Sequence, residues 1–209
     1  MPAPPGGRLD NRWITFDSRS EAHTQVYLMD AEGRNLHRIT SGDYNNLVPS
    51  WSRDGASIYF ASNRTGEAQI WKRDLRSGNE EQITHQGGFA AFESYDRKML
   101  YYSRFEGGGI WRVPVDGGPE ERITEGLHLA YWGDFAVTET GLYLLDVDAN
   151  PSPTILYYNF QTRQLTPVLR LKQNPIPWTA NLAASRDGRT LLFAEGDSKS
   201  SITMVENFQ

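Results

Sequence analysis

Short apolar stretches follow polar turns at regular intervals along the 209-residue chain. The turns have the sequences LDNR (9–12), SRDG (52–55), SYDR (94–97), TETG (138–141) and SRDG (185–188). The apolar stretches after them are WITF (13–16), IYF (58–60), LYY (100–102), LYL (142–144) and LLF (191–193). Each is followed by a segment in which apolar and polar residues alternate, such as QVYLMD (25–30). This period of two indicates β-strands with one buried face.

The whole unit repeats about every forty residues, which is the length of a propeller blade. The closing segments of successive units end in Thr40, Thr84, Thr124 and Thr166, which are 44, 40 and 42 residues apart. We therefore predict an all-β fold, a β-propeller of five four-stranded antiparallel blades with about 40–45 residues per repeat. The five units fill the chain as one domain, over residues 1–42, 43–86, 87–127, 128–172 and 173–209.

Within each blade we name the strands A to D in chain order. The segment PSWSRDGASIYFASNRTG (49–66) is then the A–B hairpin of the second blade. Its turn contains Asp54 and Gly55. An aspartate side chain can bond to nearby backbone, and glycine accepts a positive φ without strain. The fold alone therefore explains this segment.

The two terminal blades are expected to be incomplete. The first lacks a normal A strand, because APPGGRL carries two prolines and two glycines. The last ends near Phe208 and Gln209, directly after its third strand. We favour a closed ring in which the N-terminal segment adds a strand to the final blade. An edge left open would favour a homodimer through that edge.

Composition excludes several classes of function. The chain has no cysteine, so disulfides and thiolate metal sites are excluded. Its net charge of −5 argues against nucleic acid as a partner. No apolar run approaches the roughly 20 residues of a membrane span, and MPAPPGGRLDN has no apolar core of a secretory signal. We expect no membrane partner, and a periplasmic location only if a membrane-anchored parent protein carries the chain; otherwise it is cytoplasmic.

Several of these motifs resemble a known family. PSWSRDG, IYFASNRTG and QIWKRDL resemble the WD40-like, PD40-type repeats of TolB-like β-propellers. LLFAEGDSKSSITMVENF resembles the last repeat of the propeller half of bacterial regulators with a winged-helix DNA-binding domain. Members of this kind usually carry more repeats. The resemblance implies a propeller that acts as the sensing or protein-interaction part of a larger bacterial protein, without catalysis of its own.

The D–A and B–C loops form one mouth of a propeller's central channel, where a partner protein, a peptide or a small ligand would bind. We predict contact residues in the D–A loops and two arginines just after B strands, and we name all of them here: Tyr44, Asn45, Asn46, His85, Phe89, His128, Tyr131, Trp132 and Trp178, with Arg64 and Arg104. The arginines could grip a carboxylate. The alternative is structural: the aromatic residues Trp51, Phe92, Trp132 and Trp178 wedge adjacent blades together, and the arginines bridge blades.

Two further interpretations stay open. A glycoside-active enzyme would use the channel carboxylates Asp43, Glu93 and Asp134 as general acid, base and pKa modulator. These three do not share one repeat position, so we do not expect them to converge. A structural fragment, or a minimal or engineered propeller cut from a longer array, would explain the irregular termini. Only His85 and His128 lie in comparable D–A loops, so we predict no metal and no cofactor.

Overall fold

The computed structural model describes residues 6–7, 12–19, 22–104, 108–124, 127, 132–176, 180–196 and 201–206, with the backbone alone for 6–7 and 201–206. These residues form strands, turns and irregular segments, with no helix among them. No helix in the described part is long and apolar enough to cross a membrane.

Nineteen strands form five antiparallel sheets, each made of strands that follow one another along the chain. The first sheet contains β1 (Gly6–Gly7), β2 (Trp13–Ser18), β3 (Gln25–Asp30) and β4 (His37–Arg38). The second contains β5 (Asn46–Trp51), β6 (Ser57–Thr65), β7 (Glu67–Asp74) and β8 (Glu80–Gln82). The third contains β9 (Ala91–Glu93), β10 (Met99–Ser103), β11 (Ile110–Pro114) and β12 (Glu121–Arg122). The fourth contains β13 (Phe135–Val137), β14 (Gly141–Asp146), β15 (Thr154–Asn159) and β16 (Leu165–Arg170). The fifth contains β17 (Leu182–Ala184), β18 (Thr190–Glu195) and β19 (Ser201–Glu206).

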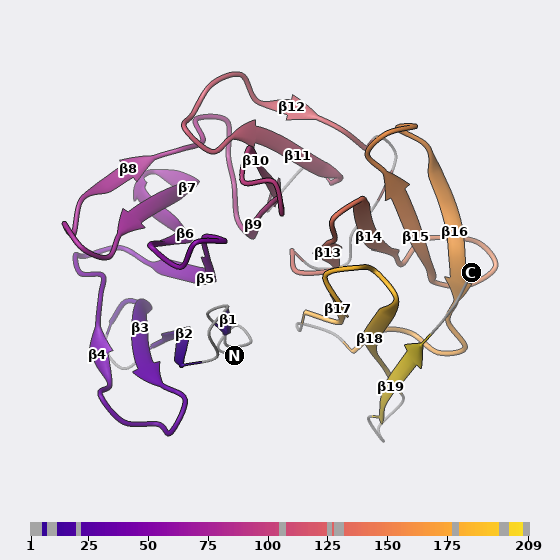
Figure 1. Cartoon of the computed structure of the whole chain (residues 1–209), viewed down its shortest axis with the longest axis horizontal. Coiled ribbons are helices and arrows are strands. Elements are labelled where there is room, and N and C mark those ends of the chain that lie inside the picture. Colours follow the sequence, from indigo (N-terminus) through magenta and orange to yellow (C-terminus); the bar gives the residue numbers. More distant parts are fainter. Residues whose placement is uncertain are drawn as a thin grey trace.

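The five sheets follow one another around an arc (Figure 1). The first strand of each sheet lies toward the middle of the arc, and β4, β8, β12 and β16 lie at its periphery. Inner strands of successive sheets are neighbours: β5 contacts β9, β9 contacts β13, and β13 contacts β17. This is the arrangement of propeller blades, and it confirms the predicted all-β propeller of meander sheets.

The hydrophobic core consists of layers between neighbouring sheets. Ile58 and Phe60 pack with Val26 and Leu28 of the first sheet, while Tyr59, on the opposite face of the same strand, packs with residues of the third sheet. All three β6 residues are at most 1% exposed. The B strands of the three middle sheets, β6, β10 and β14, are therefore buried on both faces, whereas the sequence pattern suggested one buried face. Alternation along such a strand decides which neighbouring sheet a side chain meets. In the fifth sheet β18 keeps the predicted single buried face, and its Leu192 is exposed.

The predicted hairpin turn forms as expected. Gly55 has a φ of 69°, and its N–H donates to the carbonyl of Ser52 at 2.9 Å. The Asp54 carboxylate accepts hydrogen bonds from the Ser52 hydroxyl at 2.7 Å and from the Ala56 N–H at 2.9 Å. Chiefly the bond from Ala56, with that from Ser52, lowers the pKa of Asp54.

A repeated hydrogen bond fixes the end of the D strand in three sheets. We call it the threonine bridge: the hydroxyl oxygen of Thr40, Thr84 or Thr124 accepts the N–H of a C-strand residue 14 positions earlier, at 2.7–2.8 Å. Thr166 does not repeat it. Its hydroxyl is exposed and donates to the carbonyl of Tyr157 at 3.4 Å. Thr166 thus lies one blade length after Thr124 in the sequence, but it does not occupy the equivalent position in the structure.

The terminal sheets differ from the sequence expectation. Gly6 and Gly7 form the short strand β1, which pairs with β2 inside the first sheet. The expectation that the N-terminal segment completes the final blade is therefore wrong for these residues. The first blade has an A strand, but this strand is only two residues long and so is not a normal one. The fifth sheet has three described strands, with β19 at its edge. In Figure 1 the first and fifth sheets lie apart at the two ends of the arc. Pairing of two chains through such an edge stays a prediction.

Candidate functional site

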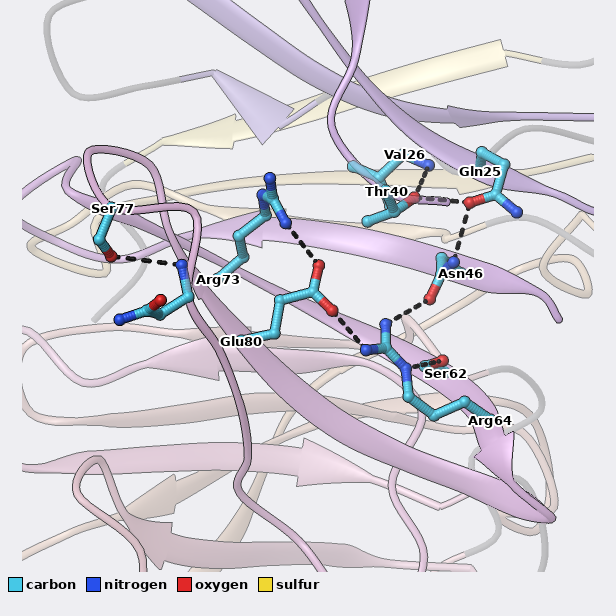
Figure 2. A network of polar contacts seen from close by, with 10 residues as sticks. Gln25, Val26, Thr40, Asn46, Ser62, Arg64, Arg73, Ser77 and Glu80 are labelled. Carbon is cyan, nitrogen blue, oxygen red and sulfur yellow. Dashed lines mark hydrogen bonds and ion pairs between the residues drawn. The ribbon is translucent and has the colours of Figure 1, made fainter. Parts of the chain in front are cut away.

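Much of the predicted channel mouth is built from contacts between the first two sheets. The Asn46 side chain donates to Gln25 Oε1 at 2.9 Å and accepts from Arg64 at 3.1 Å. Gln25 Oε1 also accepts the Thr40 hydroxyl at 2.8 Å. Arg64 continues this chain of contacts to Glu80, as Figure 2 shows. Asn46 is fully buried, so it joins two blades rather than facing a ligand.

Arg64 is held by groups of its own sheet. Its guanidinium forms an ion pair with Glu80, lies over the Trp71 ring at 4.2 Å, and has a side-chain exposure of 14%. Glu80 also pairs with Arg73 at 2.8 Å (Figure 2). A carboxylate ligand would have to compete with Glu80 for this arginine. The geometry favours a structural role for Arg64 within its own sheet, and its link to the first blade runs only through Asn46 and Gln25.

The third sheet contains a similar arrangement around Arg104. Its guanidinium lies 3.3 Å from the centre of the Trp111 ring and 3.3 Å from the Glu120 carboxylate. Glu120 accepts the Tyr102 hydroxyl at 2.5 Å and, from the second sheet, the backbone N–H of His85 at 2.7 Å. Burial raises the pKa of Tyr102, and its bond to Glu120 adds to the rise. Arg104 therefore bridges neighbouring blades through Glu120.

The aromatic candidates that can be placed mostly pack between sheets. Phe89 and Trp132 meet edge to face, with ring centres 5.7 Å apart, and both pack against the core between the third and fourth sheets. Trp51 packs against the core between the first and second sheets, and Phe92 meets Phe135 of the fourth sheet at 5.0 Å. These contacts are those of the wedge interpretation. His128, Tyr131 and Trp178 lie outside the described residues.

Several of the predicted mouth residues keep access to solvent. His85 is exposed, and Tyr44, Asn45, Phe89 and Trp132 are half-buried. The loop that holds Asn45 is fixed on both sides: Asn45 Oδ1 accepts the Thr24 N–H at 2.9 Å, and the Asn45 N–H donates to Asn63 Oδ1 at 2.8 Å. We call Tyr44, Asn45 and His85 the mouth surface.

The three carboxylates of the enzyme interpretation have different surroundings. Asp43 is exposed in the loop before β5. Asp134 is fully buried before β13, and its carboxylate accepts the backbone and side-chain N–H groups of Asn181 at 3.0 and 3.1 Å. Glu93 ends β9, at the opposite end of its A strand. The structure does not gather them around one substrate position. Within the described part of the chain, no three His, Asp or Glu residues are placed to hold a metal ion.

A cavity of about 410 Å³ lies at the other end of the blades, between the second and third sheets. Its wall is formed by two A–B turns, a C–D turn and parts of the strands. The residues that line it are Ser52, Asp54, Ser57, Tyr59, Lys72, Glu93, Asp96, Arg97, Val115 and Asp116. Glu93 is only 4% exposed and accepts the Tyr59 hydroxyl at 3.1 Å. Burial raises the pKa of Glu93, and the bond from Tyr59 offsets part of this rise.

Sequence reasoning placed the ligand at the mouth and missed this cavity. Glu93 was singled out only as a possible catalytic acid, and Tyr59, Lys72 and Asp116 were not singled out. One signal was present: when the repeats are aligned, the position of Trp51 in the second blade is Glu93 in the third. A polar residue at an apolar repeat position marks a place where packing changes.

Comparison with known proteins gives relatives among TolB-like chains. An uncharacterised protein of Agrobacterium fabrum, Atu1656, is 29% identical over 130 residues, covering 56% of this chain and 44% of that protein. A TolB homolog of Chlorobaculum tepidum is 29% identical over 116 residues, which are 54% of this chain and 27% of the relative. The crystal structure of TolB from Acinetobacter baumannii superposes with a TM-score of 0.79 at 19% identity, covering 99% of this chain and 52% of TolB. The chain thus spans about half or less of the length of these proteins.

Some matched proteins are enzymes by name. Dipeptidyl-peptidase 5 of Porphyromonas gingivalis is 28% identical over 118 residues, but the match covers only 17% of that protein.

The resemblance to winged-helix regulators stays a prediction. The model of the TolB β-propeller domain, PD40, matches residues 4–131, which is more than half of the chain. The chain therefore belongs to the family of TolB β-propeller domains.

Proposed function

We propose that this chain is a non-enzymatic protein-binding module of a larger bacterial TolB-like protein, with residues 1–209 as one propeller domain. Membership of the TolB β-propeller family is consistent with a protein-interaction module. The partner would dock on the mouth surface, with Tyr44 and His85 as contact residues. Asn46, Arg64 and Arg104 would hold the loops in place without touching the partner.

One observation carries this proposal. The loop of Tyr44 and Asn45 is held by a hydrogen bond from the Thr24 N–H and by one that Asn45 donates to Asn63 Oδ1, while Tyr44 and His85 stay accessible. A surface that is ordered before binding loses less conformational entropy when a partner docks. Partly exposed aromatic side chains on such a surface are typical of the residues that contribute most to protein binding.

The channel carboxylates give less support to an enzyme. Asp134 is already bonded to Asn181, and Glu93 lies at the other end of the blades from the mouth. A glycosidase needs two carboxyl groups within about 5–10 Å on either side of one bond. The different surroundings of the three groups do not suit that requirement.

The test compares three forms of the full-length protein as bait for binding partners in cell extract: wild type, Tyr44→Ala/His85→Ala, and Arg76→Ala. Arg76 is exposed in the C–D turn of the second sheet, away from the mouth surface. We expect wild type and Arg76→Ala to retain the same protein. The double variant should bind the purified partner at least about tenfold more weakly, since losing two contact residues costs more than 1.4 kcal/mol.

Two results would contradict the proposal. Equal binding of the partner by the double variant would remove the mouth surface as the docking site. Hydrolysis of an oligosaccharide that is lost in Glu93→Gln or Asp134→Asn would show that the chain is an enzyme instead.

A further inference from the structure

The cavity between the second and third sheets contains a carboxylate that the repeat does not require. Glu93 pairs with Leu100 in the sheet ladder, at the same repeat position at which Trp51 pairs with Ile58. In the fourth and fifth sheets this position is occupied by Val137 and Ala184. Among the second to fifth sheets, three therefore have an apolar residue at this position, and the third sheet has Glu93.

The Glu93 carboxylate is buried without an ion pair, although the Arg53 guanidinium donates to the Glu93 backbone carbonyl at 2.9 Å and the charge of Lys72 lowers the pKa of Glu93 slightly against the effect of burial. Its carboxylate accepts the Tyr59 hydroxyl at 3.1 Å, and no described lysine or arginine lies within ion-pair distance of it. Lys72 lines the same cavity, but its ammonium group lies over the Tyr59 ring, 5.8 Å from the ring centre. Buried charges in proteins are normally paired or bound to an ion, because desolvation of a lone charge is costly.

The rest of the wall does not supply the missing charge. Arg97 is already paired with Asp54 at 2.8 Å across the two sheets. Asp96 accepts the hydroxyl of Ser94 at 2.6 Å, and that bond lowers the pKa of Asp96. With Asp116, the wall has more carboxylates than cationic side chains. The charged side chains that line the cavity therefore sum to a negative charge.

We propose that this cavity binds an organic cation, an alkylammonium or guanidinium group, with Glu93 as its counter-charge. The volume of about 410 Å³ lies within the range of small-ligand sites and leaves room for the apolar stem of such a group. Asp54 and Arg97, from the two A–B turns of the wall, are partly exposed to solvent. A metal ion is a poorer match, because no three metal-ligating residues of the described chain are placed to coordinate one. The cation is either a free polyamine or a lysine or arginine side chain of another protein.

This site does not depend on the mouth surface, because it lies at the opposite end of the blades. The test titrates the ¹⁵N-labelled full chain with three probes, observed by heteronuclear NMR at low salt and pH 7.5. The probes are putrescine, a short peptide with blocked ends and a central lysine, and the same peptide with norleucine in place of lysine. We expect one or both cations to shift the amide signals of Ser57 and Asp116, and norleucine to shift neither.

Two variants test the role of Glu93. Glu93→Gln keeps the size of the side chain and removes its charge, so it should weaken cation binding at least about tenfold. Asp43→Asn removes an exposed carboxylate at the other end of the blades and should bind like wild type. If Glu93→Gln does not fold, Asp116→Lys tests the same charge requirement from the exposed rim, and it should weaken binding as well.

The outcomes separate the two sources of the cation. Binding of putrescine alone identifies a polyamine site, and binding of the lysine peptide alone identifies a side-chain site for another protein. The proposal is overturned if neither cation binds up to about 10 mM, which corresponds to a negligible affinity. It is also overturned if norleucine binds as well as lysine, or if Glu93→Gln binds as well as wild type.

Discussion

Replacing Thr84 by valine tests whether the threonine bridge stabilises its blade by fixing the end of the D strand. Thr84 is fully buried, and its hydroxyl oxygen accepts the N–H of Ile70 at 2.8 Å. The same hydroxyl donates to Gln69 Oε1 at 2.9 Å. Valine keeps the shape of threonine and removes only the hydroxyl, so the change isolates these two hydrogen bonds.

The expected cost follows from which partners are left without a bond. Gln69 Oε1 keeps a donor, because it also accepts the N–H of Gly87 at 3.0 Å. The N–H of Ile70 loses its acceptor in a buried site, which costs about 1–3 kcal/mol. For a chain of this length, each kcal/mol lowers the melting temperature by about 2–4 °C. We therefore expect Thr84→Val to melt about 4–8 °C below wild type if the cost is near 2 kcal/mol.

The assays are a thermal melt, which gives the melting temperature, and equilibrium unfolding in urea, which gives the free energy of unfolding. Both are followed by tryptophan fluorescence and by circular dichroism to establish that one transition is observed. Thr166→Val is the matched control, because Thr166 is exposed and its hydroxyl makes only a 3.4 Å contact. This control should change the free energy of unfolding by no more than about 0.5 kcal/mol. If the two variants lose the same stability, the threonine bridge does not contribute as described.

Three further predictions concern packing, backbone and charge. Phe60→Ala removes a fully buried ring between the first two sheets and should lower the free energy of unfolding by about 3–5 kcal/mol, measured in urea. Gly109→Ala should lower the melting temperature more than Gly33→Ala, although both residues have a positive φ. A Cβ at Gly109 would lie 2.6 Å from the carbonyl oxygen of Thr124, whereas a Cβ at Gly33 meets nothing within 4 Å. Equal decreases in melting temperature would contradict this prediction. Burial raises the pKa of Glu93 above 4.5 in the folded chain. The stability that the protonated Glu93 side chain contributes is therefore complete below pH 4.5, and it is lost as pH rises through the raised pKa. The stability of wild type relative to Glu93→Gln should therefore fall as pH rises above about 4.5, and a difference that stays constant would show that the pKa of Glu93 is not raised by folding.

The repeated parts of the fold could be predicted from sequence because each uses local chemistry. The hairpin around Asp54 and Gly55 is set by an Asx-type bond and a positive φ, and both are read from neighbouring residues. The apolar B strands were equally clear. That those of the middle sheets are buried on both faces was not, because a run such as Ile58 to Phe60 looks the same whether one or two neighbouring sheets cover it.

The errors came from contacts between distant segments. Gly6 and Gly7 carry no side chain whose pattern could predict a strand, and only their pairing with β2 reveals one. Thr166 follows the blade length but lies outside the threonine bridge, because a shared residue type does not fix the register of a strand.

The candidate site was predicted less well, for the same reason. Arg64 and Arg104 were correctly grouped as equivalent, but their partners Glu80 and Glu120 lie 16 residues further along the chain and were not identified. The cavity depends on which residue of the third sheet faces Tyr59 of the second, and periodicity within one blade contains no such information. An alignment of the blades against one another does show Glu93 as the exception.

Site-specific photo-crosslinking in living cells tests the central claim, that this propeller binds a protein through its mouth surface, most directly. A photoreactive phenylalanine analogue is placed in the full-length protein at position 44, 85 or 76, one position at a time. Positions 44 and 85 belong to the mouth surface, and position 76 is an exposed site in the C–D turn of the second sheet. We predict one discrete protein adduct from positions 44 and 85 and none from position 76. Adducts from position 76 alone, or none from the mouth positions, would contradict the account.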